Sequence, residues 1–126
     1  MGYPMAGYIS KAGHNVTVYN RTKTKAEKWI KEYKGKIADT PENAAKDSDF
    51  VFTCVGNDDD LKEVAIGKKG IFNTIKKGSI YIDNTTASNL TLSDFDPLQM
   101  TTILSMNRAT GFAQMVEIMS NRAKSL

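Results

Sequence analysis

The stretch Phe50-Val51-Phe52-Thr53-Cys54-Val55 is an almost unbroken apolar run. Such a run is typical of a strand that is buried on both faces of a parallel sheet, because helices cover both sides of these sheets. Shorter runs of aliphatic, β-branched or aromatic residues predict further strands on either side of it, at residues 16–19, 37–38 and 79–82. We therefore expect residues 50–55 to lie within a parallel sheet.

Helical patterns lie between these strands. The predicted helices cover residues 3–12, 24–33, 41–46, 61–66 and 71–76. Local signals mark several of their ends: Gly13 predicts a left-handed C-terminal cap, Thr24 and Glu27 form a capping box, and Thr40 before Pro41 predicts an N-cap. The alternation of strands and helices predicts the α/β class, with helices on both faces of the sheet.

The composition bounds the class of protein. The chain has 126 residues, enough for one domain, and its formal charge of +3 is too small for the basic face of a nucleic-acid binder. With Cys54 as its one cysteine and His14 as its one histidine, the chain can form neither an internal disulfide nor a Cys/His zinc site. Neither a signal peptide nor an apolar run near the ~18 residues of a membrane span is present, so we expect a cytoplasmic protein without a membrane partner.

The C-terminal part, residues 89–126, stays unassigned apart from a predicted strand at residues 101–104 and a helix face at Phe112, Met115, Val116 and Met119. We expect the segment 100–106 to return to the sheet and pair with the strand at residues 50–55. The alternative is that a second copy of the chain pairs there, which would produce homo-oligomers or aggregates.

Four ordered blocks carry a family resemblance: MGYPMA at residues 1–6, KAGHNVTVYNRT at 11–22, CVGN at 54–57 and IDNTTAS at 82–88. Together they resemble the β-hydroxyacid dehydrogenase family, which includes 3-hydroxyisobutyrate dehydrogenase, glyoxylate/succinic semialdehyde reductase and, more distantly, 6-phosphogluconate dehydrogenase. The resemblance implies that residues 1–88 form part of a Rossmann-like NAD(P)-binding domain. A two-domain enzyme of this family needs roughly twice the present length, so the resemblance implies an N- and C-terminally incomplete member.

The resemblance places Gly2 at the last glycine of the Gly-x-Gly-x-x-Gly turn that approaches the cofactor pyrophosphate. The usual first strand and both earlier glycines are lacking, and in this fold that strand lies between the two halves of the sheet. Without the other blocks, Gly2 is simply a residue near the chain start.

The end of the second family strand indicates the cofactor. NAD-specific sites usually carry Asp or Glu there for the ribose 2′-hydroxyl, whereas this chain has Asn20, followed by Arg21 and Thr22, with Lys25 nearby. Arginine and threonine can bind a 2′-phosphate, so the sequence favours NADP, with NAD as the alternative. The competing interpretation is that Arg21 is a solvated cation and Thr22 a local cap.

Further site residues follow the later strands. By resemblance, the backbone of Val55 and Gly56 passes under the nicotinamide-side ribose, Asp60 is a cofactor position, Thr85 contacts the substrate carboxylate and Thr86 lies against the nicotinamide. The alternatives are that Asp58, Asp59 and Asp60 only favour a helix start, and that the two threonines belong to an ordinary turn.

No residue is predicted to be catalytic. Lys124 lacks the glycine-rich context of the family's catalytic lysine, and the substrate domain is missing. We expect an NADP(H)-binding domain of an oxidoreductase for short β-hydroxyacids or their semialdehydes, inactive by itself. The alternatives are a non-catalytic nucleotide-binding or assembly module, or a truncated product without function.

Overall fold

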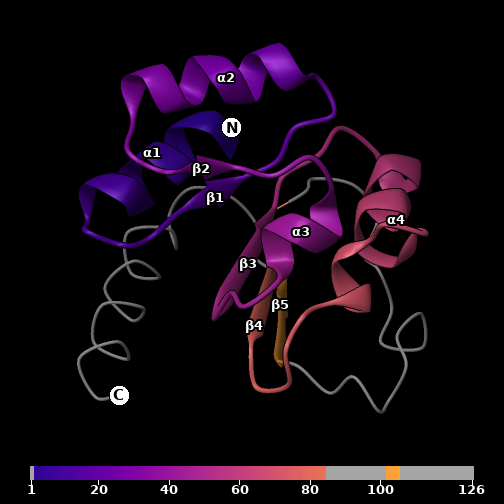
Figure 1. Cartoon of the computed structure of the whole chain (residues 1–126). Coiled ribbons are helices and arrows are strands. Elements are labelled where there is room, and N and C mark those ends of the chain that lie inside the picture. The colour runs from indigo at the N-terminus through magenta and orange to yellow at the C-terminus, as the bar shows by residue number, and fades with distance from the viewer. Residues whose placement is uncertain (1, 85–101, 106–126) are drawn as a thin grey trace.

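The computed structural model describes residues 2–84 and 102–105. Strands and helices alternate through these residues, which confirms the predicted α/β class (Figure 1). In chain order the elements are α1 (Gly2–Lys11), β1 (Thr17–Val18), α2 (Lys23–Glu32), β2 (Lys36–Ile37), α3 (Pro41–Ala45), β3 (Phe50–Thr53), α4 (Asp58–Ile66), the 3-10 helix η1 (Ile71–Asn73), β4 (Ile80–Asp83) and β5 (Thr102–Ser105).

The strands form two parallel ladders. β1 pairs with β2, and β3, β4 and β5 form a second sheet in that order. Within the described residues no ladder joins β1 to β3. These are the two strands that the family resemblance places on either side of its usual first strand. Figure 1 shows α1 and α2 packed over the β1–β2 ladder, whereas β3, β4 and β5 lie side by side below it.

The strand predicted at residues 101–104 is observed as β5, but the partner expected for it is wrong. Thr102 lies opposite Ile80 and Ser105 opposite Asp83, so β5 pairs with β4 and not with β3. Strands that follow each other along the chain usually lie next to each other in the sheet, and β5 obeys this rule by joining the strand before it. The predicted pairing through a second copy stays a prediction, and the helix predicted around residues 112–119 lies outside the described residues.

Helix ends follow local hydrogen bonding. Gly13 has a φ of 94°, as a left-handed cap requires, and the N–H of Asn43 donates to Thr40 Oγ1 at 3.2 Å at the start of α3. The capping box predicted at Thr24 is wrong, because α2 begins at Lys23 with Thr22 as its N-cap residue. The N–H of Thr22 donates to Asn20 Oδ1 at 2.8 Å, so a turn before the helix replaces the box.

Several predicted elements are shorter than expected, and the strand predicted at residues 16–19 is only Thr17–Val18. The helix predicted at residues 71–76 is only η1, which ends at Asn73, where the Asn73 side chain donates to the carbonyls of Gly67 and Lys68. The strand predicted at residues 50–55 ends at Thr53, and its burial alternates: Val51 is buried whereas Phe50 is half-buried. One face of β3 therefore packs more tightly than the other.

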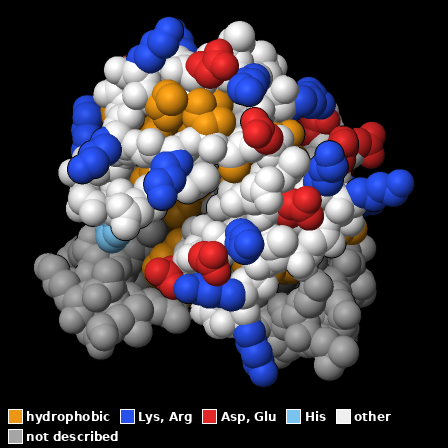
Figure 2. Space-filling model, in the orientation of Figure 1, with side chains coloured by type: hydrophobic (Ala, Val, Ile, Leu, Met, Phe, Trp, Pro, Cys, Tyr) orange, Lys and Arg blue, Asp and Glu red, His pale blue; other side chains and the backbone are white. Residues whose placement is uncertain are grey.

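The core has two parts. One cluster lies under β3 and β4 and contains Ala45, Val51, Ala65, Ile71, Phe72 and Tyr81. The other joins Ile9 of α1 to Ile82 of β4. Trp29 of α2 is 2% exposed, and its indole N–H donates to the carbonyl of Tyr3 at 3.2 Å, which fixes α2 against α1. Figure 2 shows basic and acidic side chains interspersed over one face, so a site there depends on its own few charges.

Candidate functional site

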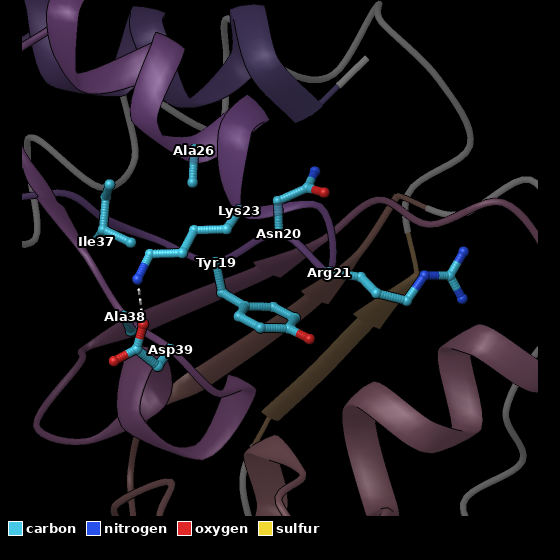
Figure 3. Close-up of a pocket in the computed structure, with 8 residues that line it drawn as sticks. All are labelled: Tyr19, Asn20, Arg21, Lys23, Ala26, Ile37, Ala38 and Asp39. Carbon is cyan, nitrogen blue, oxygen red and sulfur yellow. Dashed lines mark ion pairs between the residues drawn. The ribbon is translucent and has the colours of Figure 1, made fainter.

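A small cavity lies where β1 and β2 end. Its volume is about 100 Å³, and its walls come from the ends of both strands and the first turn of α2. It is lined by Tyr19, Asn20, Arg21, Lys23, Ala26, Ile37, Ala38 and Asp39 (Figure 3). Because β1 and β2 are parallel, their carboxyl ends meet at one edge, which is where ligands bind in open α/β sheets.

The cavity contains charged residues that sequence analysis missed. Lys23 Nζ lies 3.6 Å from Asp39 Oδ1, and Figure 3 shows this ion pair on one side of the cavity. Asp39 comes two residues after β2, so a carboxylate does reach the edge, although from the neighbouring strand rather than from β1. The sequence contained a signal for Asp39, because a polar residue that follows a strand of a parallel sheet lies beside the ends of the neighbouring strands.

The residues predicted to recognise the cofactor separate into two groups. Asn20 and Arg21 line the cavity, whereas Thr22 and Lys25 do not. Thr22 is the N-cap residue of α2, its side chain makes no capping hydrogen bond, and its N–H is held by Asn20. Lys25 is exposed on the helix surface. Of these four predicted residues, Asn20 and Arg21 therefore line the cavity, and Lys23 lines it in addition.

Arg21 lies beside Asp60, another predicted site residue. The guanidinium Nη1 donates to Asp60 Oδ1 at 2.8 Å. Asp60 is itself held by Asn57: the N–H of Asp60 donates to Asn57 Oδ1 at 2.9 Å, and Asn57 Nδ2 donates to Asp60 Oδ2 at 3.1 Å. Figure 3 shows Arg21 directed away from Lys23 and Asp39. The ion pair thus connects the end of β1 to the first turn of α4.

The three acids Asp58, Asp59 and Asp60 form the first turn of α4, as the alternative of a helix start requires, so the helix predicted at residues 61–66 begins three residues earlier. Asn57 is its N-cap residue. Acidic side chains are favourable there because they complement the positive end of the helix dipole. Asp60 serves this local role and also binds Arg21.

Gly2 begins α1 beside the end of β3. A methyl group at Gly2 would lie 3.4 Å from the Cβ of Cys54, so the helix start and the strand end are in contact. Val55 and Gly56 follow directly, and among the described residues a Cβ at Gly56 would meet only Asp60 Oδ2, at 4.0 Å. The structure therefore brings Gly2, Val55, Gly56 and Asp60 to one edge.

Buried polar groups fix the ends of β3 and β4. Thr53 Oγ1 donates to Asp83 Oδ1 at 3.0 Å and shares a hydrogen bond of 2.9 Å with Tyr81 Oη. Burial raises the pKa of the Tyr81 phenol, with a further rise from the nearby Asp83 carboxylate and an opposing effect from the Thr53 hydrogen bond. These bonds fix the two strands relative to each other immediately before the residues expected to contact a ligand.

Asn84 follows β4 at this edge. Its backbone N–H donates to the Thr53 carbonyl at 2.8 Å, while its buried Nδ2 has no hydrogen-bond partner in the part of the chain that the structure describes. A buried donor without an acceptor is a group that a ligand can satisfy. Thr85 and Thr86, the predicted substrate and nicotinamide positions, lie outside the described residues.

The donor set fits one end of a dinucleotide. Pockets that enclose a whole small ligand span roughly 300–1,000 Å³, so a cavity of about 100 Å³ accommodates one sugar or phosphate group. Lys23 suits a phosphate, and Arg21 does so once its guanidinium turns from Asp60. The remaining contacts would come from the edge formed by Gly2, Gly56 and Asn84. Among the described residues, no group of His, Cys, Asp and Glu side chains is arranged to hold a metal ion.

Comparison with known proteins relates this chain to NAD-binding domains and oxidoreductases. A family model described as the NAD-binding domain of 6-phosphogluconate dehydrogenase matches residues 1–96. An uncharacterized oxidoreductase of Shewanella frigidimarina (strain NCIMB 400) is 58% identical over 88 residues, which are 70% of this chain and 30% of that protein. The protein named probable 3-hydroxyisobutyrate dehydrogenase-like 1, mitochondrial, of Arabidopsis thaliana is 40% identical over 88 residues, 69% of this chain and 26% of that protein.

The fold has a counterpart among solved structures. The 3-hydroxyisobutyrate dehydrogenase of Mycobacterium tuberculosis, solved with L-serine, aligns with a TM-score of 0.71 at 17% identity and covers 93% of this chain and 40% of that one. This likeness shows a shared fold. The chain spans about 30% of the length of its Shewanella relative and 26% of the Arabidopsis one. No helix within residues 2–84 is both long enough and apolar enough to cross a membrane.

Proposed function

The chain belongs to the family of NAD-binding domains of 6-phosphogluconate dehydrogenase, and we propose that it binds NADP(H) in preference to NAD(H) at the carboxyl edge of β1 and β3. The observation that carries the preference is the end of β1, where Asn20 and Arg21 line the cavity at the position that NAD-specific sites usually give to Asp or Glu. An arginine there can form charge-assisted hydrogen bonds to a 2′-phosphate.

The local charges support this preference. Lys23 adds a second cation to the cavity, and the Asp39 carboxylate is partly neutralised by its ion pair with Lys23. Both side chains of that pair are largely exposed, so the pair is weak and can rearrange around a ligand. The Lys23 ammonium can therefore turn from Asp39 to a phosphate bound beside Asn20.

The remaining roles are proposals for this chain by resemblance. We propose that residues 1–88 form the cofactor-binding part and that Gly2 lies beside the pyrophosphate. The backbone of Val55 and Gly56 would pass under the nicotinamide-side ribose, Asp60 would be a cofactor position, and Thr86 would contact the nicotinamide. Thr85 would hold the carboxylate of a short β-hydroxyacid or its semialdehyde. The bound cofactor supplies hydride transfer, while the residues of this chain bind and orient it.

Calorimetric titration with NADPH and NADH tests the cofactor preference. We expect tighter binding of NADPH, and Arg21→Ala should remove most of the difference because a charge-assisted hydrogen bond is worth about 1.5–3 kcal/mol. Lys28→Ala is the matched control, since it removes one exposed cation from α2 outside the cavity lining. Equal affinities of the unaltered chain for both cofactors would refute the preference.

We also propose that the chain does not turn over substrate by itself. Hydride transfer to a carbonyl needs a proton donor beside the reacting oxygen, and none of its residues matches the family's catalytic lysine. In a spectrophotometric assay we expect no NADP-dependent oxidation of 3-hydroxyisobutyrate, glycerate or 4-hydroxybutyrate above background. Sustained turnover by the purified chain would show that another group performs this step.

A further inference from the structure

The Asp60 carboxylate forms an ion pair with Arg21, which is the residue that we propose binds the 2′-phosphate of the cofactor. Arg21 Nη1 lies 2.8 Å from Asp60 Oδ1, and the side chains are 76% and 24% exposed, respectively. The less exposed partner is also the better fixed one, because Asn57 binds both the N–H and the Oδ2 of Asp60. In this pair the carboxylate is therefore held by further hydrogen bonds, whereas the arginine is the more exposed partner.

From this geometry we infer that Asp60 is a specificity-determining residue, which competes with the cofactor 2′-phosphate for Arg21 and so limits the preference for NADP(H). The inference rests on the proposed function and names a further residue of the same site. It differs from the role implied by resemblance, in which Asp60 contacts the cofactor itself.

The direction of the effect follows from charge. A guanidinium next to a carboxylate is already partly neutralised, and a phosphate that approaches the same group meets the repulsion of that carboxylate. Arg21 must leave Asp60, or share its donors with it, before a 2′-phosphate can be bound fully. A ligand without a 2′-phosphate makes no use of Arg21, so its affinity does not depend on the pair.

The pair also joins elements of separate ladders. Arg21 follows β1, and Asp60 belongs to the helix that follows β3. When Arg21 moves to a phosphate, the contact between these two parts is exchanged for a contact between β1 and the ligand. Asn57 is the positioning residue in this arrangement, because it holds the Asp60 carboxylate at the edge.

The size of the effect is that of an exposed ion pair. Arg21 is mostly exposed, so its ion pair with Asp60 is weak. We expect this pair to lower the affinity of the chain for a ligand with a 2′-phosphate by about two- to fivefold. The nucleotides 2′,5′-ADP and 5′-AMP are suitable probes, because both carry adenosine and a 5′-phosphate and they differ in the 2′-phosphate.

The experiment is a calorimetric titration of the full chain with both probes. We expect Asp60→Asn to bind 2′,5′-ADP about two- to fivefold more tightly, with 5′-AMP affinity unchanged, and Asp60→Ser to act in the same way if the amide variant folds poorly. Asp59→Asn is the matched control, because it removes one exposed carboxylate from the same helical turn, and it should change neither affinity by more than about 1.5-fold. In an Arg21→Ala background, the gain from Asp60→Asn should be largely lost.

The outcomes separate the two proposals. If no nucleotide binds, or if Arg21→Ala leaves the affinity ratio of the two probes unchanged, the proposed cofactor preference fails and this inference fails with it. If the ratio depends on Arg21 but Asp60→Asn leaves it unchanged or lowers it, the inference alone is overturned. The same conclusion follows if Asp59→Asn raises the affinity for 2′,5′-ADP as much as Asp60→Asn does.

Discussion

Arg21 and Asp60 are 39 residues apart in the sequence, yet their side chains form a 2.8 Å ion pair at the carboxyl edge of the strands. Both were predicted to contact a cofactor, and the structure brings them into contact with each other. Because Arg21 is mostly exposed, the pair holds little of the folding energy and is suited to exchange with a ligand.

The first prediction concerns the stability of Arg21→Ala. We expect the free energy of unfolding to change by less than about 1 kcal/mol, since exposed ion pairs contribute about 0.2–1 kcal/mol. Urea unfolding followed by circular dichroism measures this change. A loss above about 2 kcal/mol would mean that the pair holds the two ladders together, and binding losses of this variant would then reflect folding.

Local signals in the sequence predicted most of the elements. Gly13 and Thr40 act on groups within a few residues of themselves, and the structure confirms both caps. The apolar run at residues 50–55 also predicted a strand at the right place, because β-branched and aromatic side chains are enriched on the half-buried surfaces of sheets. The capping box predicted at Thr24 was wrong because the hydrogen bond between the Thr22 N–H and Asn20 forms a turn that shifts the start of the helix.

Contacts between distant residues could not be predicted in this way. The neighbour of β5 depends on how the chain returns to the sheet, and the contact of Arg21 with Asp60 depends on how α4 packs beside β1. Packing of whole elements sets these relationships, and no local pattern contains them.

A second prediction compares two N-cap threonines. Thr40→Ala should lower the free energy of unfolding by about 1 kcal/mol, because it removes the acceptor of the Asn43 N–H. Thr22→Ala should change it by only a few tenths, since Thr22 makes no capping hydrogen bond with its side chain. Thermal unfolding of both variants tests the difference, and equal losses would show that the hydrogen bond at Thr40 contributes nothing.

A third prediction concerns Gly35, which lies against the ring of Trp29. A Cβ there would come within 2.6 Å of the Trp29 ring and 2.7 Å of the Val16 carbonyl oxygen. The buried ring and the backbone cannot both give way, so Gly35→Ala should cost about 1–3 kcal/mol. Gly56→Ala is the control, because the nearest atom of the described residues would be 4.0 Å from the added methyl group. Unfolding curves in urea that coincide for the two variants would contradict this packing.

The last prediction concerns stability at high pH and follows from the buried phenol of Tyr81. Tyr81 is 1% exposed, and burial raises its pKa above the ordinary value of 10. Between pH 10 and the raised pKa, the unfolded chain releases the phenol proton while the folded chain retains it. The free energy of unfolding must therefore fall as the pH rises, by up to about 1.4 kcal/mol per pH unit from this group. Below pH 10 the contribution is fully present.

Comparison with Tyr81→Phe isolates this contribution. The variant should lose about 1 kcal/mol at neutral pH, because the hydrogen bond to Thr53 is removed, but its stability should fall less steeply above pH 10. Tyr3, whose hydrogen bond to Glu32 raises its pKa to about 12, acts in the same direction in both proteins and cancels in the difference. Urea unfolding at several pH values from 9 to 11 gives the slopes, and equal slopes for Tyr81→Phe and the unaltered chain would mean that the phenol titrates in the folded protein as it does in water.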